Sequence, residues 1–169
     1  MKETLGVMQR PASTGSVSIR HERRALWGGL TMGFGFGGLF DSVLLHQILQ
    51  WHNVISARVV PDTVGHLRTN ILADGLLSAA MVVVLGIGFA LLWSASALGR
   101  MPARQLIGAL MLGWGGFNVY DSVVHHWLLQ LHHIREGPGH SELAYDLGFF
   151  LFALILLGVG AMLIRDLRR

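Results

Sequence analysis

The chain has 169 residues, of which 52% are hydrophobic and only 14% are charged. An ordinary globular chain carries about a quarter charged residues, so this composition excludes a typical soluble domain. Cysteine is absent, which excludes disulfides, thiolate metal sites and cysteine-bound iron–sulfur clusters. The formal net charge of +3 has a topological explanation, given below, and we therefore expect no nucleic-acid partner.

The N-terminal 25 residues are polar and end in a basic cluster that contains Arg20, Arg23 and Arg24. They lack the order of a secretory signal, in which a basic start leads directly into a short apolar core and a cleavage site. We therefore predict that residues 1–25 form a disordered cytoplasmic tail.

Four apolar runs follow the tail, at residues 27–51, 69–97, 105–131 and 143–164. A helix needs about 20 mostly apolar residues to span a bilayer, and each run is long enough. The sequence thus predicts an all-α integral membrane protein whose four-helix bundle occupies residues 26–169. Its surroundings would be the lipid bilayer, and no residues remain for a second domain.

Basic residues are distributed unequally between the two sides of these spans. If the N-terminus lies inside, ten of the 13 lysines and arginines fall on the cytoplasmic side, and Arg58, Arg68 and Arg135 fall outside. The positive-inside rule then places both termini in the cytoplasm, as in a multi-pass protein of an inner (cytoplasmic) membrane. Every histidine except His21 falls at the outer helix ends or in the outer loops, which places the polar chemistry in the outer half of the bilayer.

The first and third runs carry a motif that occurs twice, eighty positions apart. GGLFDSVLLHQILQWH at 37–52 and FNVYDSVVHHWLLQLH at 117–132 share the same residues at the positions of Asp41, His46 and His52. Such self-similarity is the mark of an internal duplication. It predicts two parallel two-helix repeats, at residues 27–97 and 105–164, related by an axis along the membrane normal.

The aspartates and histidines inside these apolar spans indicate a functional site, because such groups are costly in a membrane. A lone aspartate at a helix centre costs roughly 2.5 to 3.5 kcal/mol on insertion scales. Each second helix adds one more acid, Asp74 and Asp146. At about 1.5 Å per residue, counting inward from the outer helix ends places His46, His126 and both acids at one depth, on the order of 10 Å. We predict that these four side chains form one coordination layer.

Helical spacing adds further candidates around this layer. At about 100° per residue, Asp41 and His52 share one stripe of their helix, three turns apart. Asp121 and His125 are four residues apart, which lets one helix offer two ligands to one ion; Leu45 stands where His125 does, so the two copies should differ. The predicted metal ligands are therefore Asp41, His46, His52, Asp74, Asp121, His125, His126, His132 and Asp146.

Several functions fit these residues. Imidazole and carboxylate bind copper, iron and zinc, so we interpret the set as a transition-metal site for redox or hydrolytic chemistry, or for metal delivery to a respiratory or oxygenase complex. Enzymatic activity thus stays open. The alternatives are a haem b held between His46 and His126 for electron transfer, a proton half-channel, and a structural membrane subunit. Protein partners considered are another membrane complex and a second copy of the chain.

The runs DSVLLHQILQWH and DSVVHHWLLQLHH resemble a bacterial family of small four-helix integral membrane proteins, domain of unknown function 2243. The likeness covers about residues 27–164. In the family pattern, the first motif often has a second histidine where this chain has Asn53, and a glycine where it has Ser42. The second motif often has a glutamate where this chain has Asp121, and a further acidic residue where it has Val124. The resemblance implies a membrane protein with a histidine-rich outer site and supplies no activity.

Overall fold

The computed structural model describes residues 14–165, and these form four helices and no strand. The elements in chain order are α1 (Thr14–Asp41), η1 (Ser42–Ile48), α2 (Val64–Ser96), α3 (Ala103–Tyr120), η2 (Asp121–Leu128) and α4 (Glu142–Arg165). The short segments η1 and η2 are π-helical and continue α1 and α3. The all-helical prediction is confirmed for the described part of the chain.

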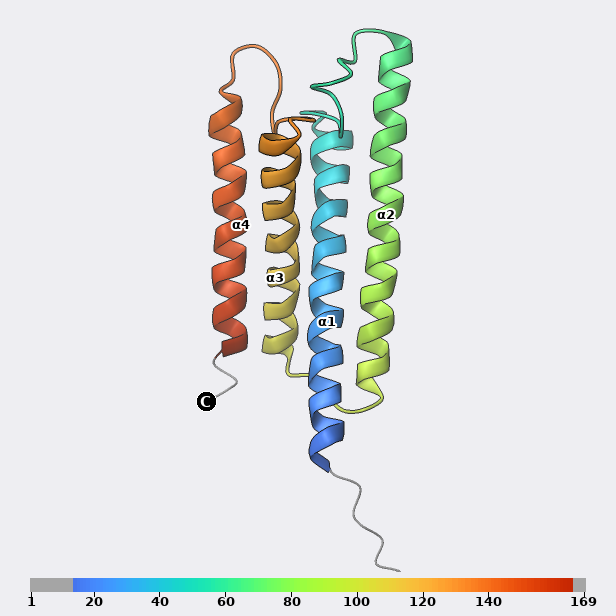
Figure 1. Ribbon diagram of the computed structural model, residues 1–169, viewed down its shortest axis with the longest axis vertical. Helices are drawn as coiled ribbons and strands as arrows, with labels where there is room; N and C mark the ends of the chain where they lie inside the picture. Colours follow the sequence, from blue (N-terminus) through green and yellow to red (C-terminus); the bar gives the residue numbers. More distant parts are fainter. Residues whose placement is uncertain (1–13, 166–169) are drawn as a thin grey trace, which may run out of the picture.

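The helices pack in the order α2, α1, α3, α4 (Figure 1). The central helices α1 and α3 contact each other, α2 packs against α1, and α4 packs against α3. The start of α1 and the end of α4 lie at one end of the molecule, whereas the loops that follow η1 and η2 lie at the other (Figure 1). Both histidine motifs therefore meet at the same end.

The central helices approach each other closely at two glycines. A β-carbon added to Gly33 would overlap the carbonyl of Leu110, and one added to Gly113 would overlap the carbonyl of Leu30. Small residues allow helix backbones to approach in this way inside a membrane. The contact is reciprocal. Leu30 and Leu110 are eighty positions apart, and so are Gly33 and Gly113.

A second pair of glycines, Gly35 and Gly115, packs against the outer helices. A β-carbon on Gly35 would lie 2.9 Å from the backbone nitrogen of Leu85 on α2, and one on Gly115 would lie 2.9 Å from the carbonyl oxygen of Ala153 on α4. Each central helix thus uses one glycine toward its central neighbour and another toward its outer neighbour.

Three of the described helices are long and apolar enough to cross a membrane. Their mean hydropathies are 1.2 for Arg20–Ile48, 2.5 for Val64–Ser96 and 2.7 for Glu142–Arg165. Only 11% of the α2 window and 17% of the α4 window are buried, so the outer helices present apolar surface that lipid can cover. The helix α3, predicted as a fourth span, is not among the three.

The N-terminal boundary of α1 differs from the expectation. The helix begins at Thr14, so residues 14–25, which the sequence assigned to a disordered tail, are helical. The segment contains Glu22, Arg23, Arg24 and Ala25, which are good helix formers, and it holds no proline. Residues 1–13 of the expected tail lie outside the described residues.

The central helices end earlier than predicted. The expected spans 27–51 and 105–131 end at Ile48 and Leu128, after seven and eight π-helical residues. The π geometry closes on hydrogen bonds to the fifth preceding carbonyl, as from the Leu49 amide to the Leu44 oxygen at 2.8 Å. Single π turns of this kind occur frequently at functional sites.

Candidate metal centre

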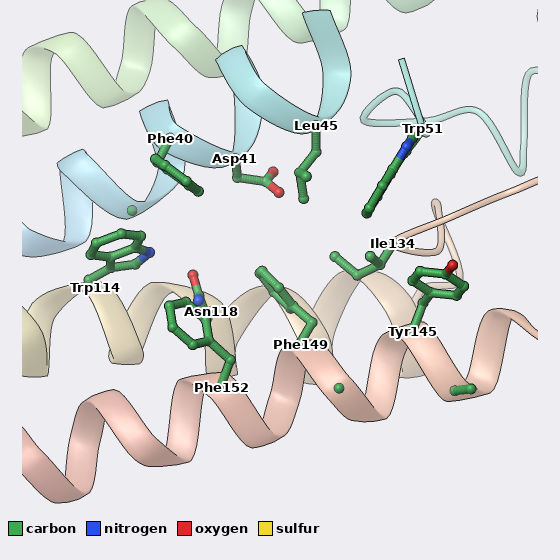
Figure 2. A pocket seen from close by; sticks show the side chains of 13 residues that line it. Phe40, Asp41, Leu45, Trp51, Trp114, Asn118, Ile134, Tyr145, Phe149 and Phe152 are labelled. Carbon is green, nitrogen blue, oxygen red and sulfur yellow. The ribbon is translucent and has the colours of Figure 1, made fainter. Parts of the chain in front are cut away.

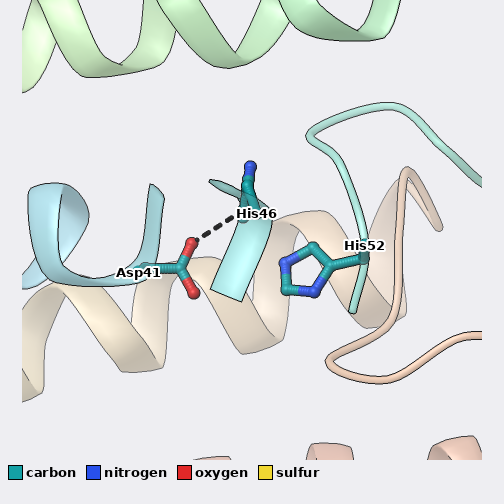
Figure 3. Close-up of side chains that lie close together, drawn as sticks. All are labelled: Asp41, His46 and His52. Carbon is teal, nitrogen blue, oxygen red and sulfur yellow. Dashed lines mark hydrogen bonds and ion pairs between the residues drawn. The ribbon is translucent and has the colours of Figure 1, made fainter. Parts of the chain in front are cut away.

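The first cluster of metal-binding side chains consists of Asp41, His46 and His52, at the loop end of α1 (Figure 3). All three are buried, with relative exposures of 2%, 2% and 3%. One nitrogen or oxygen atom from each lies within 4.8 Å of the other two. At these distances the three groups can share one ion.

The π-helical segment η1 brings Asp41 beside His46. His46 Nε2 lies 3.0 Å from Asp41 Oδ2, although the two residues are five apart in sequence. Side chains that meet on an α-helix are three or four residues apart, so the sequence expectation placed Asp41 and His46 on neighbouring stripes. The wider turn joins them into one site.

A reversal of the chain after η1 brings His52 back to the same place. Gln50 has φ 50°, in the left-handed region that often ends a helix. The ring centroids of His46 and His52 are 4.4 Å apart, where a continuous helix would separate the residues by about 9 Å along its axis. The prediction that Asp41 and His52 lie three turns apart on one helix is therefore wrong.

The second cluster consists of Asp121, His126 and His132, and repeats this construction eighty positions later. His126 Nε2 lies 3.0 Å and His132 Nε2 3.7 Å from Asp121 Oδ2. Gln130 has φ 49° and turns the chain back, as Gln50 does. All three side chains are buried, with exposures of 2%, 0% and 2%.

Several atoms of the two clusters have no hydrogen-bond partner. They are Asp41 Oδ1, His52 Nε2, Asp121 Oδ2, His126 Nε2 and His132 Nε2. His126 Nε2 and Asp121 Oδ2 are close together but are not aligned as a hydrogen bond. An unsatisfied buried polar group costs about 1–3 kcal/mol. A cation placed between these acceptors would satisfy them together.

Backbone carbonyls fix the tautomers of His52 and His132. Nδ1 of His52 donates to the Ile134 oxygen at 2.9 Å, and Nδ1 of His132 donates to the Val54 oxygen at 2.9 Å. A neutral ring that donates from Nδ1 carries its lone pair on Nε2. Burial, together with the neighbouring His132 and His46, holds the pKa of His52 well below its ordinary value, which keeps this lone pair free at neutral pH.

Asp74 holds His46 from behind. Its Oδ1 lies 2.9 Å from His46 Nδ1 and accepts the Val54 amide at 2.9 Å, while its Oδ2 accepts the Asn53 side chain at 2.7 Å. The carboxylate therefore contacts the ring nitrogen that does not face Asp41. A carboxylate in this position orients a ligating histidine and strengthens it as a donor.

Asp146 lies against His126 in the corresponding position, although His126 Nδ1 is not aligned with it as a hydrogen bond. Its Oδ1 lies 3.2 Å from His126 Nδ1 and accepts the Ile134 amide at 2.9 Å, and its Oδ2 lies 2.7 Å from His133 Nδ1. The sequence prediction placed Asp74 and Asp146 in one coordination layer with the histidines. The structure places them against the histidines, but on the far side of each ring.

The two clusters adjoin through their loop histidines. The rings of His52 and His132 are stacked, with centroids 4.6 Å apart and planes at 11°. His132 also lies 6.0 Å from His46 and 4.9 Å from His126, measured between ring centroids. The clusters thus form one continuous polar core between the loop ends of α1 and α3.

Comparison with known families supports the membrane setting of this core. The family model described as predicted membrane protein (DUF2243) matches residues 28–167. The chain belongs to this family. No curated protein and no solved structure matches it. The resemblance expected from the two histidine motifs is thereby confirmed.

In this DUF2243 protein, His125 contacts the site from outside the second cluster. Its Nδ1 lies 2.7 Å from Asp121 Oδ1, while Asp121 Oδ2 faces His126 and His132. The side chain is 19% exposed. The i to i+4 contact expected from the sequence is therefore present, and it places His125 behind the carboxylate.

Three features of the DUF2243 site were missed or set aside at the sequence level. Asn53 and His133 occupy corresponding positions and contact Asp74 and Asp146, and neither is among the metal ligands predicted from the sequence. The carbonyls that hold the loop histidines were not considered. Their only signal in the sequence is that each lies two residues beyond a histidine of the motif.

Each cluster offers two imidazoles and one carboxylate. This set suits zinc, and it matches the two-histidine, one-carboxylate arrangement by which non-haem iron is held with coordination positions left open. The residues present therefore fit a transition-metal ion.

Proposed function

We propose that this protein binds transition-metal ions at the two His/Asp clusters and uses them for redox or hydrolytic chemistry. The observation that carries the proposal is the convergence of unpartnered, buried acceptor atoms at Asp121, His126 and His132, matched by those at Asp41 and His52. Zinc, iron and copper all accept this donor set. Three protein ligands leave positions open for water or substrate.

The contacts behind the ligands favour a resident ion over one that is passed to another protein. His46 makes a hydrogen bond to the Asp74 carboxylate, the Asp146 carboxylate lies 3.2 Å behind His126, and His52 and His132 donate to backbone carbonyls. Partners of this kind raise metal affinity, and their removal typically costs 10- to 100-fold. A delivery protein needs a ligand set that opens easily, which these contacts oppose.

A haem suits these contacts less well. His46 Nε2 lies 3.0 Å from one carboxylate and His46 Nδ1 lies 2.9 Å from another. His126 is enclosed in the same way by Asp121 and Asp146. An axial haem ligand needs one nitrogen directed at the iron, with the flat porphyrin beside the ring in an apolar space. In this protein a carboxylate lies beside each ring nitrogen of both histidines, where the iron would have to bind.

The proposal places the clusters in the outer half of a cytoplasmic membrane, with both termini inside and α3 crossing alongside the other helices. The distribution of basic residues supports this orientation. Contacts that recur eighty positions apart, such as Gly33 on Leu110 and Gly113 on Leu30, support two parallel repeats. A conducting path is not supported, since the titratable groups of the site gather at one end of the helices.

Metal analysis of the detergent-purified chain tests the proposal. We expect wild-type protein to retain zinc, iron or copper through dialysis, and His52→Ala and His132→Ala each to lose at least tenfold in affinity. His66→Ala is the matched control, because His66 is exposed and contacts Asp62 outside the clusters. Wild-type protein that binds none of the three metals would contradict the proposal, as would equal retention by the cluster variants and the control.

A further inference from the structure

A pocket of about 320 Å³ lies beside the first cluster, between α1 and α4 (Figure 2). Six of its 13 lining residues are aromatic: Phe40, Trp51, Trp114, Tyr145, Phe149 and Phe152. Both flanking helices are long and apolar enough to cross a membrane. Phe40 and Phe152 at the rim are 42% and 41% exposed, so the pocket opens toward the hydrocarbon of the bilayer.

Two buried polar side chains reach the wall of this apolar space. Figure 2 shows Asp41 and Asn118 directed into it from opposite helices. They are 2% and 1% exposed. Asp41 Oδ1 and both side-chain polar atoms of Asn118 have no hydrogen-bond partner. Buried polar groups in native proteins are almost always paired, so these atoms call for a ligand that donates and accepts hydrogen bonds.

The corresponding place in the other half of the protein is differently built. Phe117 stands where Gly37 does, and Gly38 stands where Asn118 does. A β-carbon added to Gly38 would lie 2.8 Å from the Phe117 ring, so this ring fills the space. The open, polar-tipped pocket is therefore a feature of the Asp41 side.

We propose that the pocket binds the head group of a membrane-soluble hydroquinone. The aromatic walls suit a flat ring, which prefers offset or edge contacts with other rings. One hydroxyl donates to Asp41 Oδ1, and the other oxygen accepts from the Asn118 amide. The alkyl tail leaves between α1 and α4 into lipid. The pocket volume falls in the range of small-molecule sites, about 300–1,000 Å³.

This inference deepens the proposed function by naming a substrate class for the same site. Asp41 links the two, because its carboxylate lines the pocket and its Oδ2 lies 3.0 Å from His46 Nε2. A hydroquinone bound to Asp41 would thus be one carboxylate away from the ion. Binding itself requires no metal, so it can be measured on metal-free protein.

The test measures binding of 2-decylhydroquinone to the full chain in lipid nanodiscs, by equilibrium dialysis under argon. Decylbenzene, which lacks both hydroxyls, is the matched probe. The variant Gly148→Leu fills the pocket without a clash, because Gly148 lines it and an added β-carbon meets nothing within 4 Å. Gly158→Leu is the control, since Gly158 lies on the same helix, outside the pocket, and is equally open.

We expect one hydroquinone per wild-type chain, at least tenfold weaker binding by Gly148→Leu, unchanged binding by Gly158→Leu, and at least tenfold weaker binding of decylbenzene. Asn118→Leu should also weaken binding of the hydroquinone but not that of decylbenzene. Equal binding of the two probes would overturn the inference in favour of a lipid-chain site. Equal binding by the two glycine variants would overturn it as well. Metal content, measured on each protein as purified and before the metal is removed, shows separately whether the proposed metal site fails.

Discussion

The four histidines of the clusters are of two kinds, which differ in the group that contacts the ring nitrogen Nδ1. His46 and His126 are backed by carboxylates, whereas His52 and His132 donate to neutral carbonyls. A carboxylate behind a ring makes it a stronger donor to a metal than a carbonyl does. Each cluster therefore combines one stronger and one weaker imidazole donor, which would set how firmly a bound ion holds its other ligands.

The stability of the metal-free protein should fall as the pH is lowered through the range below 6.5. Burial lowers the pKa of His52 in the folded state, whereas the unfolded chain has the ordinary value near 6.5. The unfolded state then binds more protons below pH 6.5, so the contribution of His52 is present above that pH and is lost below it. Thermal unfolding at pH 7, 6 and 5 measures the trend. In His52→Gln the decline should be shallower, and an identical decline would refute this role of His52.

The second cluster should bind its ion more tightly than the first. His125 contacts Asp121 Oδ1 at 2.7 Å, and in the other half Leu45 offers no such contact to Asp41. Asp121→Asn should therefore reduce metal occupancy more than Asp41→Asn does. His125→Leu, which copies the first motif, should weaken binding by about 10- to 100-fold. Competitive metal titration resolves these differences. Equal losses from Asp41→Asn and Asp121→Asn would instead indicate one symmetric site.

At the scale of helices, the contact between α1 and α3 depends on two glycines that admit no side chain. Gly33→Ala and Gly113→Ala should each lower stability by about 1–3 kcal/mol, because the added methyl group overlaps a backbone carbonyl. Gly86→Ala is the matched control on α2, where a β-carbon meets nothing within 4 Å. Thermal unfolding in detergent compares the three. A Gly33→Ala protein as stable as the control would show that the helices can separate without cost.

The positions of the helices could be predicted from the sequence, but the ends of the central helices could not. Apolar runs locate spans because lipid excludes polar side chains, and this rule holds over long windows. The reversal at Gln50 is different, since glutamine has no intrinsic preference for φ 50°. The loop that follows it is held by contacts with residues far away in the sequence, such as Ile134, whose carbonyl accepts from His52.

Most residues of the site could be identified from the sequence, but their arrangement in space could not. Asp41, His46, Asp121 and His126 stand out because charged groups are costly in apolar helices. A projection at 100° and 1.5 Å per residue assumes an unbroken α-helix, and it therefore sets His52 too far from His46. Which side of a ring a carboxylate occupies depends on how separate helices pack, and no spacing along one helix contains that information.

At the scale of the whole molecule, the two loops exchange hydrogen bonds. His52, from the first loop, is fixed by the Ile134 carbonyl of the second, and His132 is fixed by the Val54 carbonyl of the first. A loop that moves away from its own cluster thus also releases the histidine of the other. The two loops are thus coupled: each half of the chain needs the other to fix its loop histidine, and a displacement of either loop would disturb both clusters at once.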